Sequence, residues 1–306
     1  MNKDYFSKVK ILDGGMGQAL LAKGLKAKGS LWSATALIDK KYHQLVVDTH
    51  LDFINSGADV IVTNNFSARR KRMKDNNVYE HFNFANEKAG ELALKAKKIS
   101  KKNILIAGSL PAQNDTYVQD ERDKNLIKKD FLDQANLLKP FVDFFYLDVL
   151  SSIKEVEVAL DVVESANLPV LVGIHIKKNG KLPSGETITE MYKKCKNNSW
   201  LGLIAACVSP EIIEKTSHEI KNLEIPFGFK ANLWKTEEPI PVHKFASPGY
   251  KIAANPTETM GSRNDYEDIN FLKFSKRMVD KGATILGGCC ETKTSHINAI
   301  SKLKLS

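Results

Sequence analysis

The 306-residue sequence predicts an α/β protein built as a single (β/α)8 barrel. Eight short apolar segments alternate with amphipathic stretches, a pattern typical of parallel strands joined by helices. The apolar segments are continuous rather than alternating in polarity, as expected for strands covered on both faces. A doubly wound open sheet is the alternative, because alternation alone does not distinguish the two folds.

The predicted strands are the short apolar runs at 9–14, 58–65, 103–109, 143–149, 169–175, 201–207, 225–231 and 283–288. The segments between them read as helices. In 84–102, apolar residues recur three and four positions apart on one face, at Ala85, Ala89, Leu92, Ala96 and Ile99. Ser152 and Glu155 offer a capping box for one helix, and Ser209 followed by Pro210 indicates the start of another.

Two stretches lack periodicity and are expected to be long loops, 113–124 and 235–265. Long structureless loops in a compact protein are usually functional or mobile. No linker rich in Gly, Pro or Ser divides the chain, so we expect one domain over residues 1–306.

The net charge of +9 requires a nucleic-acid interpretation to be considered. The one dense basic run is 69–74, and no aromatic residues alternate with it as in a base-stacking surface. We interpret the run as solvent-exposed surface, with anion recognition as the alternative. No apolar run reaches membrane-spanning length, and the charged start MNKDYFSKVK lacks an apolar targeting region. We therefore expect a cytoplasmic protein with neither a membrane nor a nucleic acid as partner.

Three of the four cysteines fall where predicted strands end, at Cys207, Cys289 and Cys290. Strand ends converge at one mouth of a barrel, and three thiolates around one point suit zinc with a fourth position open. Three buried small apolar side chains are the equally weighted alternative on spacing alone. The fourth cysteine, Cys195, shares a helical stripe with Ile188 and is expected in the core.

Two carboxylates, Asp13 and Asp148, also end apolar strands. A lone aspartate there could simply cap a turn, but two beside a metal indicate recognition of a cationic group such as an α-amine. Gly14 and Gly15 would leave backbone N–H groups open to a substrate carboxylate. His175 also ends a strand, and a satisfied core histidine is the better interpretation.

Five motifs in order resemble the homocysteine S-methyltransferase family: ILDGGMGQALLAKG, GADVIVTNNFS, GSLPA, IAACVSP and ILGGCCET. The resemblance extends from about Lys10 to Leu303. It implies a (β/α)8 barrel and Zn²⁺ held by Cys207, Cys289 and Cys290. The implied activity is zinc-dependent transfer of a methyl group to the thiol of homocysteine, which gives methionine.

The resemblance also implies a substrate site made of Asp13, Gly14, Gly15, Thr63, Asp148 and Asn232. Asp13 matches the aspartate of the family's DGG element. Asp148 stands where most relatives have glutamate, so its carboxylate is one methylene shorter. Asn232 matches an asparagine that the family places near the zinc.

The methyl donor is not identified by the sequence. Onium donors favour aromatic walls, and the candidates are Trp32, Phe66, Tyr146 and Trp234, each of which could instead pack in the core. Betaine-using relatives carry tyrosine at the position of Ser67, which weakens a betaine assignment. The basic run resembles that of the methionine synthase homocysteine domain, so a methyl-carrier partner is also considered.

Three other functions remain open: a catalytically idle zinc module that docks a methyl-carrier protein, a methyltransferase for a different thiol, and a nucleic-acid-binding protein. The sequence does not predict the oligomeric state.

Overall fold

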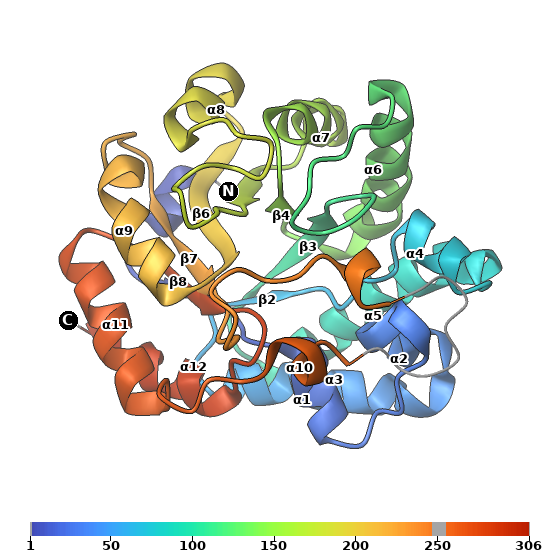
Figure 1. The fold of residues 1–306 in the computed structure, drawn as a ribbon. Coiled ribbons are helices and arrows are strands. Elements are labelled where there is room, and N and C mark those ends of the chain that lie inside the picture. The colour runs from blue at the N-terminus through green and yellow to red at the C-terminus, as the bar shows by residue number, and fades with distance from the viewer. Residues whose placement is uncertain (1, 247–254, 306) are drawn as a thin grey trace.

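A computed structural model describes residues 2–246 and 255–305, and it shows a barrel of eight parallel strands (Figure 1). The hydrogen-bonded order is β1-β8-β7-β6-β5-β4-β3-β2. The sheet closes between its first and last members, because Leu12 bridges Val60 and the Asp13 N–H donates to the Val60 carbonyl at 3.0 Å. The predicted (β/α)8 barrel is confirmed, and the open-sheet alternative is wrong.

All eight predicted strands are present, and the bounds differ from the predicted ones by a few residues. They are β1 Lys10–Ile11, β2 Val60–Val62, β3 Leu105–Pro111, β4 Phe144–Leu150, β5 Val170–Ile174, β6 Trp200–Val208, β7 Phe227–Ala231 and β8 Ile285–Gly288.

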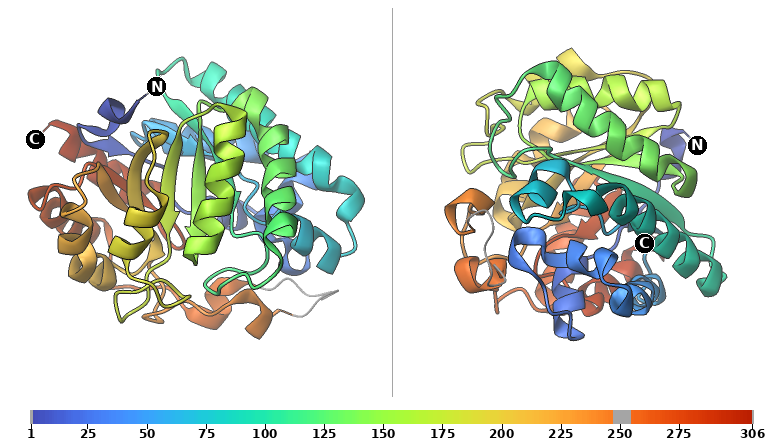
Figure 2. Two further views of the ribbon diagram at one scale, coloured as in Figure 1. Left: turned by 90° about the horizontal axis from the view of Figure 1, so that it is seen from above. Right: turned by 90° about the vertical axis from the view of Figure 1, so that its right-hand side faces the viewer.

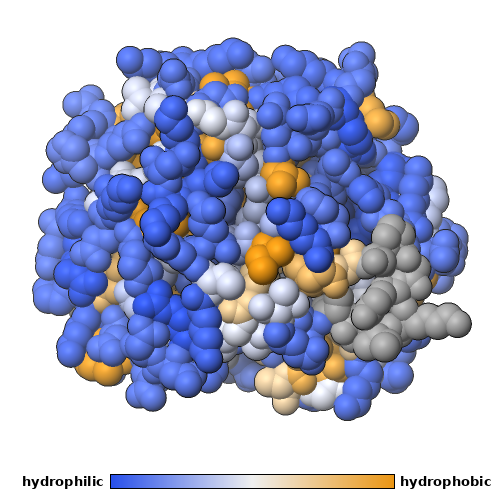
Figure 3. Space-filling view, in the orientation of Figure 1, coloured by the Kyte–Doolittle hydropathy of each residue, from blue (hydrophilic) through white to orange (hydrophobic). Residues whose placement is uncertain are grey.

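Helices surround the strands in all three ribbon views (Figures 1 and 2). They are α1 Met16–Ala22, α2 Thr35–Ile38, α3 His43–Asn55, α4 Arg70–Asp75, α5 Phe82–Ser100, α6 Lys124–Leu138, α7 Ile153–Ala166, α8 Ile188–Cys195, α9 Pro210–Lys221, α10 Pro256–Met260, α11 Asp268–Asp280 and α12 Thr294–Ser301. None of these described helices is long and apolar enough to cross a membrane. The face of the molecule in Figure 3 is largely hydrophilic.

The predicted helix starts are found, with differences in detail. The Ser152 hydroxyl caps α7 by accepting from the Glu155 N–H, while the Glu155 carboxylate reaches back to the Ser151 N–H. Pro210 occupies the first turn of α9, although the Ser209 side chain makes no capping bond. The prediction that Ile99 belongs to the buried face of α5 is wrong, because it lies at the edge of that stripe in the last turn and is 49% exposed.

The inside of the barrel is filled by side chains, so the site can lie only at one end. Phe6, from the short 3-10 segment before β1, is fully buried and packs edge-to-face on Phe144 inside the barrel. Because Phe6 lies ahead of the first strand, it fills the end at which the strands begin. The opposite end, where the strands finish, is left for the functional groups, as in other (β/α)8 enzymes.

Candidate metal and substrate site

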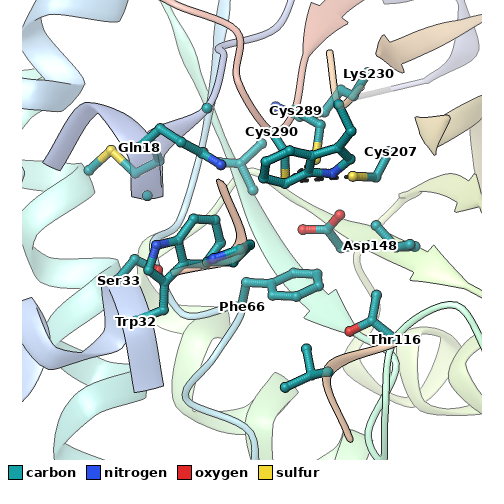
Figure 4. A pocket seen from close by; sticks show the side chains of 18 of the residues that line it. Gln18, Trp32, Ser33, Phe66, Thr116, Asp148, Cys207, Lys230, Cys289 and Cys290 are labelled. Atoms are coloured by element: carbon teal, nitrogen blue, oxygen red, sulfur yellow. Dashed lines mark hydrogen bonds between the residues drawn. The ribbon is translucent and has the colours of Figure 1, made fainter. Parts of the chain in front are cut away.

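One pocket opens at the carboxyl ends of the strands, and the three strand-end cysteines line it (Figure 4). The sulfur of Cys207 lies 3.7 Å from that of Cys290, which lies 3.9 Å from that of Cys289. With zinc–sulfur bonds of about 2.3 Å, the edge of a tetrahedron is about 3.8 Å. Two of the three sulfur–sulfur distances therefore match the edge of a zinc tetrahedron, and the third is within 4.8 Å.

Among the residues that the structure describes, these cysteines are the one group of three or more His, Cys, Asp or Glu side chains that could hold a single metal ion. The donor set of three soft thiolates is the one that zinc favours. Cys195 is buried on α8, in the hydrophobic core, and takes no part in this group.

Cys207 reaches the pocket because its backbone leaves the regular strand geometry. It has a φ of 54°, and the register between β6 and β7 shifts between Ala206 and Val208. Such a bulge redirects a side chain, and positive φ in a non-glycine residue is costly unless neighbours hold it. Here the Asn232 amide donates to the Cys207 carbonyl at 2.6 Å. Asn232 is itself fully buried and does not line the pocket, so its contacts support the cysteine rather than face a substrate.

The pair Cys289–Cys290 is placed by close packing at the end of β8. A side chain on Gly288 would lie 2.1 Å from the Thr292 hydroxyl, so only glycine fits there. The Cys289 N–H donates to the Ala231 carbonyl at 2.7 Å, and the Cys290 carbonyl accepts from the Leu233 N–H at 3.0 Å. These bonds tie both cysteines to the end of β7 and aim them at Cys207.

Asp13 lines the pocket, but both of its carboxylate oxygens have protein partners. One oxygen accepts from the Val62 N–H at 2.7 Å, and the other forms an ion pair with the Lys230 ammonium. Lys230 projects from β7 and is 5% exposed. This lysine could not be identified beforehand, because it lies within an apolar strand, 217 residues away from Asp13 in the chain.

Asp148 is the less engaged of the two carboxylates. It accepts one hydrogen bond from the Ser109 hydroxyl at 2.8 Å and is 7% exposed, facing the three sulfurs (Figure 4). Burial, followed by the negative charge of Cys289, raises the pKa of Asp148 to about 7, and the positive charge of Lys230 opposes this shift. Val149, the next residue, has a φ of 66° where the register of β4 shifts, so this strand also bulges at the site.

The two glycines differ in what they can offer a substrate. The Gly15 N–H donates to the Thr292 carbonyl at 2.9 Å, so the prediction that it is open is wrong: the chain turns back here against the loop after β8. Gly14 donates its N–H to no acceptor among the described residues and lines the pocket. Thr63 also lines it, with its hydroxyl bonded to Asn65 at 2.6 Å.

Three of the four predicted aromatic residues line the pocket: Trp32, Phe66 and Trp234. Trp32 and Phe66 lie together, across the pocket from the cysteines (Figure 4). Tyr146 does not line it and is fully buried inside the barrel. It lies two residues before Asp148 on β4, so it points to the same interior side but one layer deeper.

The two long loops supply pocket residues that the sequence did not identify individually. The first contributes Thr116 and Tyr117, and the Tyr117 hydroxyl lies 3.2 Å from the sulfur of Cys207. The ring of Tyr117 packs against His175 with its plane tilted by 59°, and the His175 ring nitrogen faces the Ala206 carbonyl at 3.4 Å, as expected for a core histidine. The second loop adds a set of apolar side chains: Ile240, Val242, Phe245, Pro256 and Met260. Residues 247–254 of that loop lie outside the described part of the chain.

The interpretation of the basic run as solvent-exposed surface is wrong for two of its members. Arg69 is fully buried and Arg72 is 7% exposed, and Arg72 lines the pocket. Arg69 turns inward to donate to the Ala112 carbonyl and the Thr116 hydroxyl after β3, and Arg72 turns inward to donate to the Ser67 hydroxyl after β2. Arg70 forms ion pairs with Asp130 and Asp133.

Comparison with known proteins agrees with this geometry. The family model for homocysteine S-methyltransferase matches residues 10–303. Homocysteine S-methyltransferase 3 of Arabidopsis thaliana is 24% identical, covering 96% of this chain and 89% of the relative. Selenocysteine methyltransferase of Astragalus bisulcatus is 21% identical, covering 96% and 91%.

The fold is also that of a solved structure, the metallated form of the homocysteine methyltransferase MmuM from Escherichia coli. The two superpose with a TM-score of 0.77 at 17% identity, covering 96% of each chain. Because the family model spans almost the whole barrel and includes its three strand-end cysteines, the chain belongs to the homocysteine S-methyltransferase family.

Proposed function

We propose that this protein transfers a methyl group from an onium donor to the thiol of homocysteine, with Zn²⁺ held by Cys207, Cys289 and Cys290. The observation that carries the proposal is the spacing of the three sulfurs, at 3.7 and 3.9 Å, in a pocket that also has a carboxylate and an aromatic wall. Bound zinc would supply an open coordination position and lower the pKa of a substrate thiol.

The side chains around the cysteines suit an amino acid acceptor. The carboxylate of Asp148 faces the sulfurs and would accept hydrogen bonds from the substrate amine. The N–H of Gly14, which has no acceptor within the described part of the chain, would donate to the substrate carboxylate. These contacts would fix the thiol beside the metal and orient it toward the donor, which is the main contribution to rate in a displacement without a general base.

The methyl transfer needs neither an oxidant nor a reductant. The thiolate electron pair forms the new sulfur–methyl bond, while the bond between the methyl carbon and the positively charged donor atom breaks and its electron pair stays on the donor. Trp32, Phe66 and Trp234 line the part of the pocket in which that cationic donor would lie. Aromatic faces attract such cations by about 0.5–2 kcal/mol each.

Methionine formation from homocysteine, measured with a panel of onium donors, tests this function. We expect turnover in zinc-loaded wild type and in Cys195→Ala, and none in Cys290→Ala. Turnover by Cys290→Ala at the wild-type rate would exclude the three-thiolate site. The absence of methionine with every donor would leave the idle docking module as the better account.

A methyltransferase for another thiol or selenol is the second candidate. It is favoured by two observations: Asp13 is already paired with Lys230, and the acid at position 148 is short. One relative is also named as a selenocysteine methyltransferase. Competition kinetics among homocysteine, cysteine and selenocysteine decide between the two acceptors, and we expect homocysteine to be preferred.

A further inference from the structure

Arg72 is a buried cation at the pocket wall. It belongs to α4, the short helix that follows β2, and its side chain is 7% exposed. Phe66, Thr116 and Tyr117 line the same pocket. An arginine keeps its positive charge under all ordinary conditions, so a charge is held here in a largely dry environment.

The protein provides almost nothing to balance that charge. Among the described residues, the guanidinium of Arg72 makes a single hydrogen bond, to the Ser67 hydroxyl at 3.3 Å, and no ion pair. Residues 247–254, outside the described part of the chain, contain no Asp or Glu. Burial lowers the pKa of Arg72, which reflects the cost of holding its charge without a close partner.

The acids nearest to Arg72 are committed elsewhere. Asp75 pairs with Lys71 at 2.6 Å. Asp115 accepts from the His243 backbone N–H at 3.1 Å and from the Thr116 N–H at 2.7 Å. Of the other cations in the run, Arg70 is paired with two aspartates and Lys71 with one, while Lys74 is exposed to solvent. Arg72 is therefore the member of the run that is buried at the pocket and lacks an acid.

Arg69 adds a second positive charge behind this wall. It is fully buried, donates to the Ala112 carbonyl and to the Thr116 hydroxyl at 2.8 Å, and lies over the ring of Phe66 at 5.1 Å. With Asp115 as the nearest opposing charge, the two guanidinium groups leave this end of the pocket positive. The hydrogen bonds of Arg69 to the loop after β3 give it a structural role. Within the described part of the chain, Arg72 has guanidinium N–H groups that no protein acceptor uses, so it can bind a ligand.

We propose that Arg72 binds the carboxylate of the methyl donor and so determines which onium donors the site accepts. The inference rests on the proposed methyl transfer. A guanidinium offers two parallel N–H groups that match a carboxylate, and the ligand would supply the anion that the protein lacks. The cationic end of the same donor would lie against Trp32 and Phe66, with its methyl group toward the sulfurs.

The donor, rather than homocysteine, is the ligand that fits Arg72. The groups suited to the amino acid, Asp148 and Gly14, end strands beside the cysteines. Phe66 lies across the pocket from the cysteines (Figure 4), and the Arg72 guanidinium is held on that side because it donates to the hydroxyl of Ser67, the residue after Phe66. A carboxylate at Arg72 therefore belongs to the molecule that occupies the aromatic side.

The test compares donors that differ only in the carboxylate: S-methylmethionine and glycine betaine, each against its methyl ester. We expect wild type to prefer the acid of the donor that it uses. Arg72→Met should lower kcat/KM for that acid roughly ten- to hundredfold and leave the ester unchanged, since a charged hydrogen bond is lost. Arg72→Lys should recover part of the loss, and the KM for homocysteine should not change.

Lys74→Met is the matched control, because Lys74 is an exposed cation on the same helix. It should behave as wild type with all four compounds. The thermal midpoint of Arg72→Met without ligand should not fall, since the change removes an uncompensated buried charge. An equal loss with acid and ester, or a change confined to the KM of homocysteine, would overturn the inference.

If wild type uses neither donor pair, the proposed function fails for these donors, and calorimetric titration with the same compounds decides the inference separately. Binding of an acid that is lost in Arg72→Met and retained in Lys74→Met supports the anion site. Failure of both acids to bind wild type, or equal binding of acid and ester, contradicts it.

Discussion

The ammonium of Lys230 pairs with one oxygen of the Asp13 carboxylate, and both groups are buried at the mouth of the barrel. The other oxygen accepts from the Val62 N–H at 2.7 Å, and the ammonium also donates to the Asp13 carbonyl at 3.2 Å. The pair thus links β7 to the end of β2 and to the segment that follows β1. It also leaves Asp13 without a free oxygen directed at a ligand.

Breaking this ion pair from one side should destabilise the protein. We expect Lys230→Met and Asp13→Asn each to lower the free energy of unfolding by roughly 3–5 kcal/mol, because each leaves a buried charge uncompensated. The double variant should lose much less than the sum of the two. Denaturant unfolding of all four proteins measures the coupling, and additive losses would show that the two side chains do not interact.

Asp148 should be the main carboxylate for the substrate amine. We expect Asp148→Asn to raise the KM for homocysteine roughly 10- to 100-fold, since a charged hydrogen bond is worth about 1.5–3 kcal/mol. Asp148→Glu should be tolerated or mildly harmful. In Asp13→Asn the KM should change less than in Asp148→Asn, because the Asp13 carboxylate is already occupied. A larger effect from Asp13→Asn would restore the interpretation from sequence, in which Asp13 holds the amine.

Asn232 should act on the metal through the backbone of Cys207. The hydrogen bond of 2.6 Å from the Asn232 amide to the Cys207 carbonyl helps to hold Cys207 at its positive φ. Asn232→Ala removes this bond, so the backbone of Cys207 can relax and move its sulfur. Partners that support metal ligands typically contribute 10- to 100-fold to affinity, so zinc affinity should fall by about that factor. Competition with a chelator measures it, and Asn222→Ala, at the exposed end of α9, serves as the control. Equal affinities in the two variants would show that Asn232 does not position the ligand.

His50 should make the fold sensitive to acid. It is fully buried on α3, and neither ring nitrogen has a hydrogen-bond partner among the described residues. Burial lowers the pKa of His50 to about 4, so between about pH 4 and 6.5 the unfolded chain binds a proton that the folded chain does not. Stability contributed by the neutral ring is therefore present at neutral pH and lost as the pH falls through this range.

The corresponding variant is His50→Leu. Its stability relative to wild type should rise by about 2 kcal/mol between pH 7 and pH 5. Urea unfolding at both pH values measures this change, with His218→Leu at an exposed position of α9 as the control. The same relative stability at both pH values would mean that His50 finds a proton-accepting partner in the folded protein.

The strands and the cysteine cluster could be predicted because each depends on a short stretch of consecutive residues. Continuous apolar runs mark strands that are covered on both faces, and a cysteine at the end of such a run must lie at the mouth of a barrel. The partners of Asp13 could not be predicted, since Lys230 is distant in the chain and sits within an apolar strand. The prediction for Arg72 was wrong for a related reason. A basic run is normally exposed to solvent, and only the tertiary structure shows which of its side chains turn inward.

The positions of the aromatic residues show the same limit. Phe66, Tyr146 and Trp234 lie near strand ends and Trp32 lies in the 3-10 segment 29–34, yet Tyr146 points to the layer below the pocket. Depth along a strand depends on the stagger of the barrel, which the sequence does not state. The positive φ of Cys207 likewise depends on the bulge in β6, which arises from its pairing with β7.

X-ray absorption at the zinc edge, with and without homocysteine, tests the central claim most directly. Without substrate, zinc should have three sulfur ligands at about 2.3 Å and one lighter atom. Addition of homocysteine should give four sulfurs at that distance, because the substrate thiol takes the open position. A sulfur count that stays at three in the presence of saturating homocysteine would contradict the account, as would a zinc ion bound without the three cysteines.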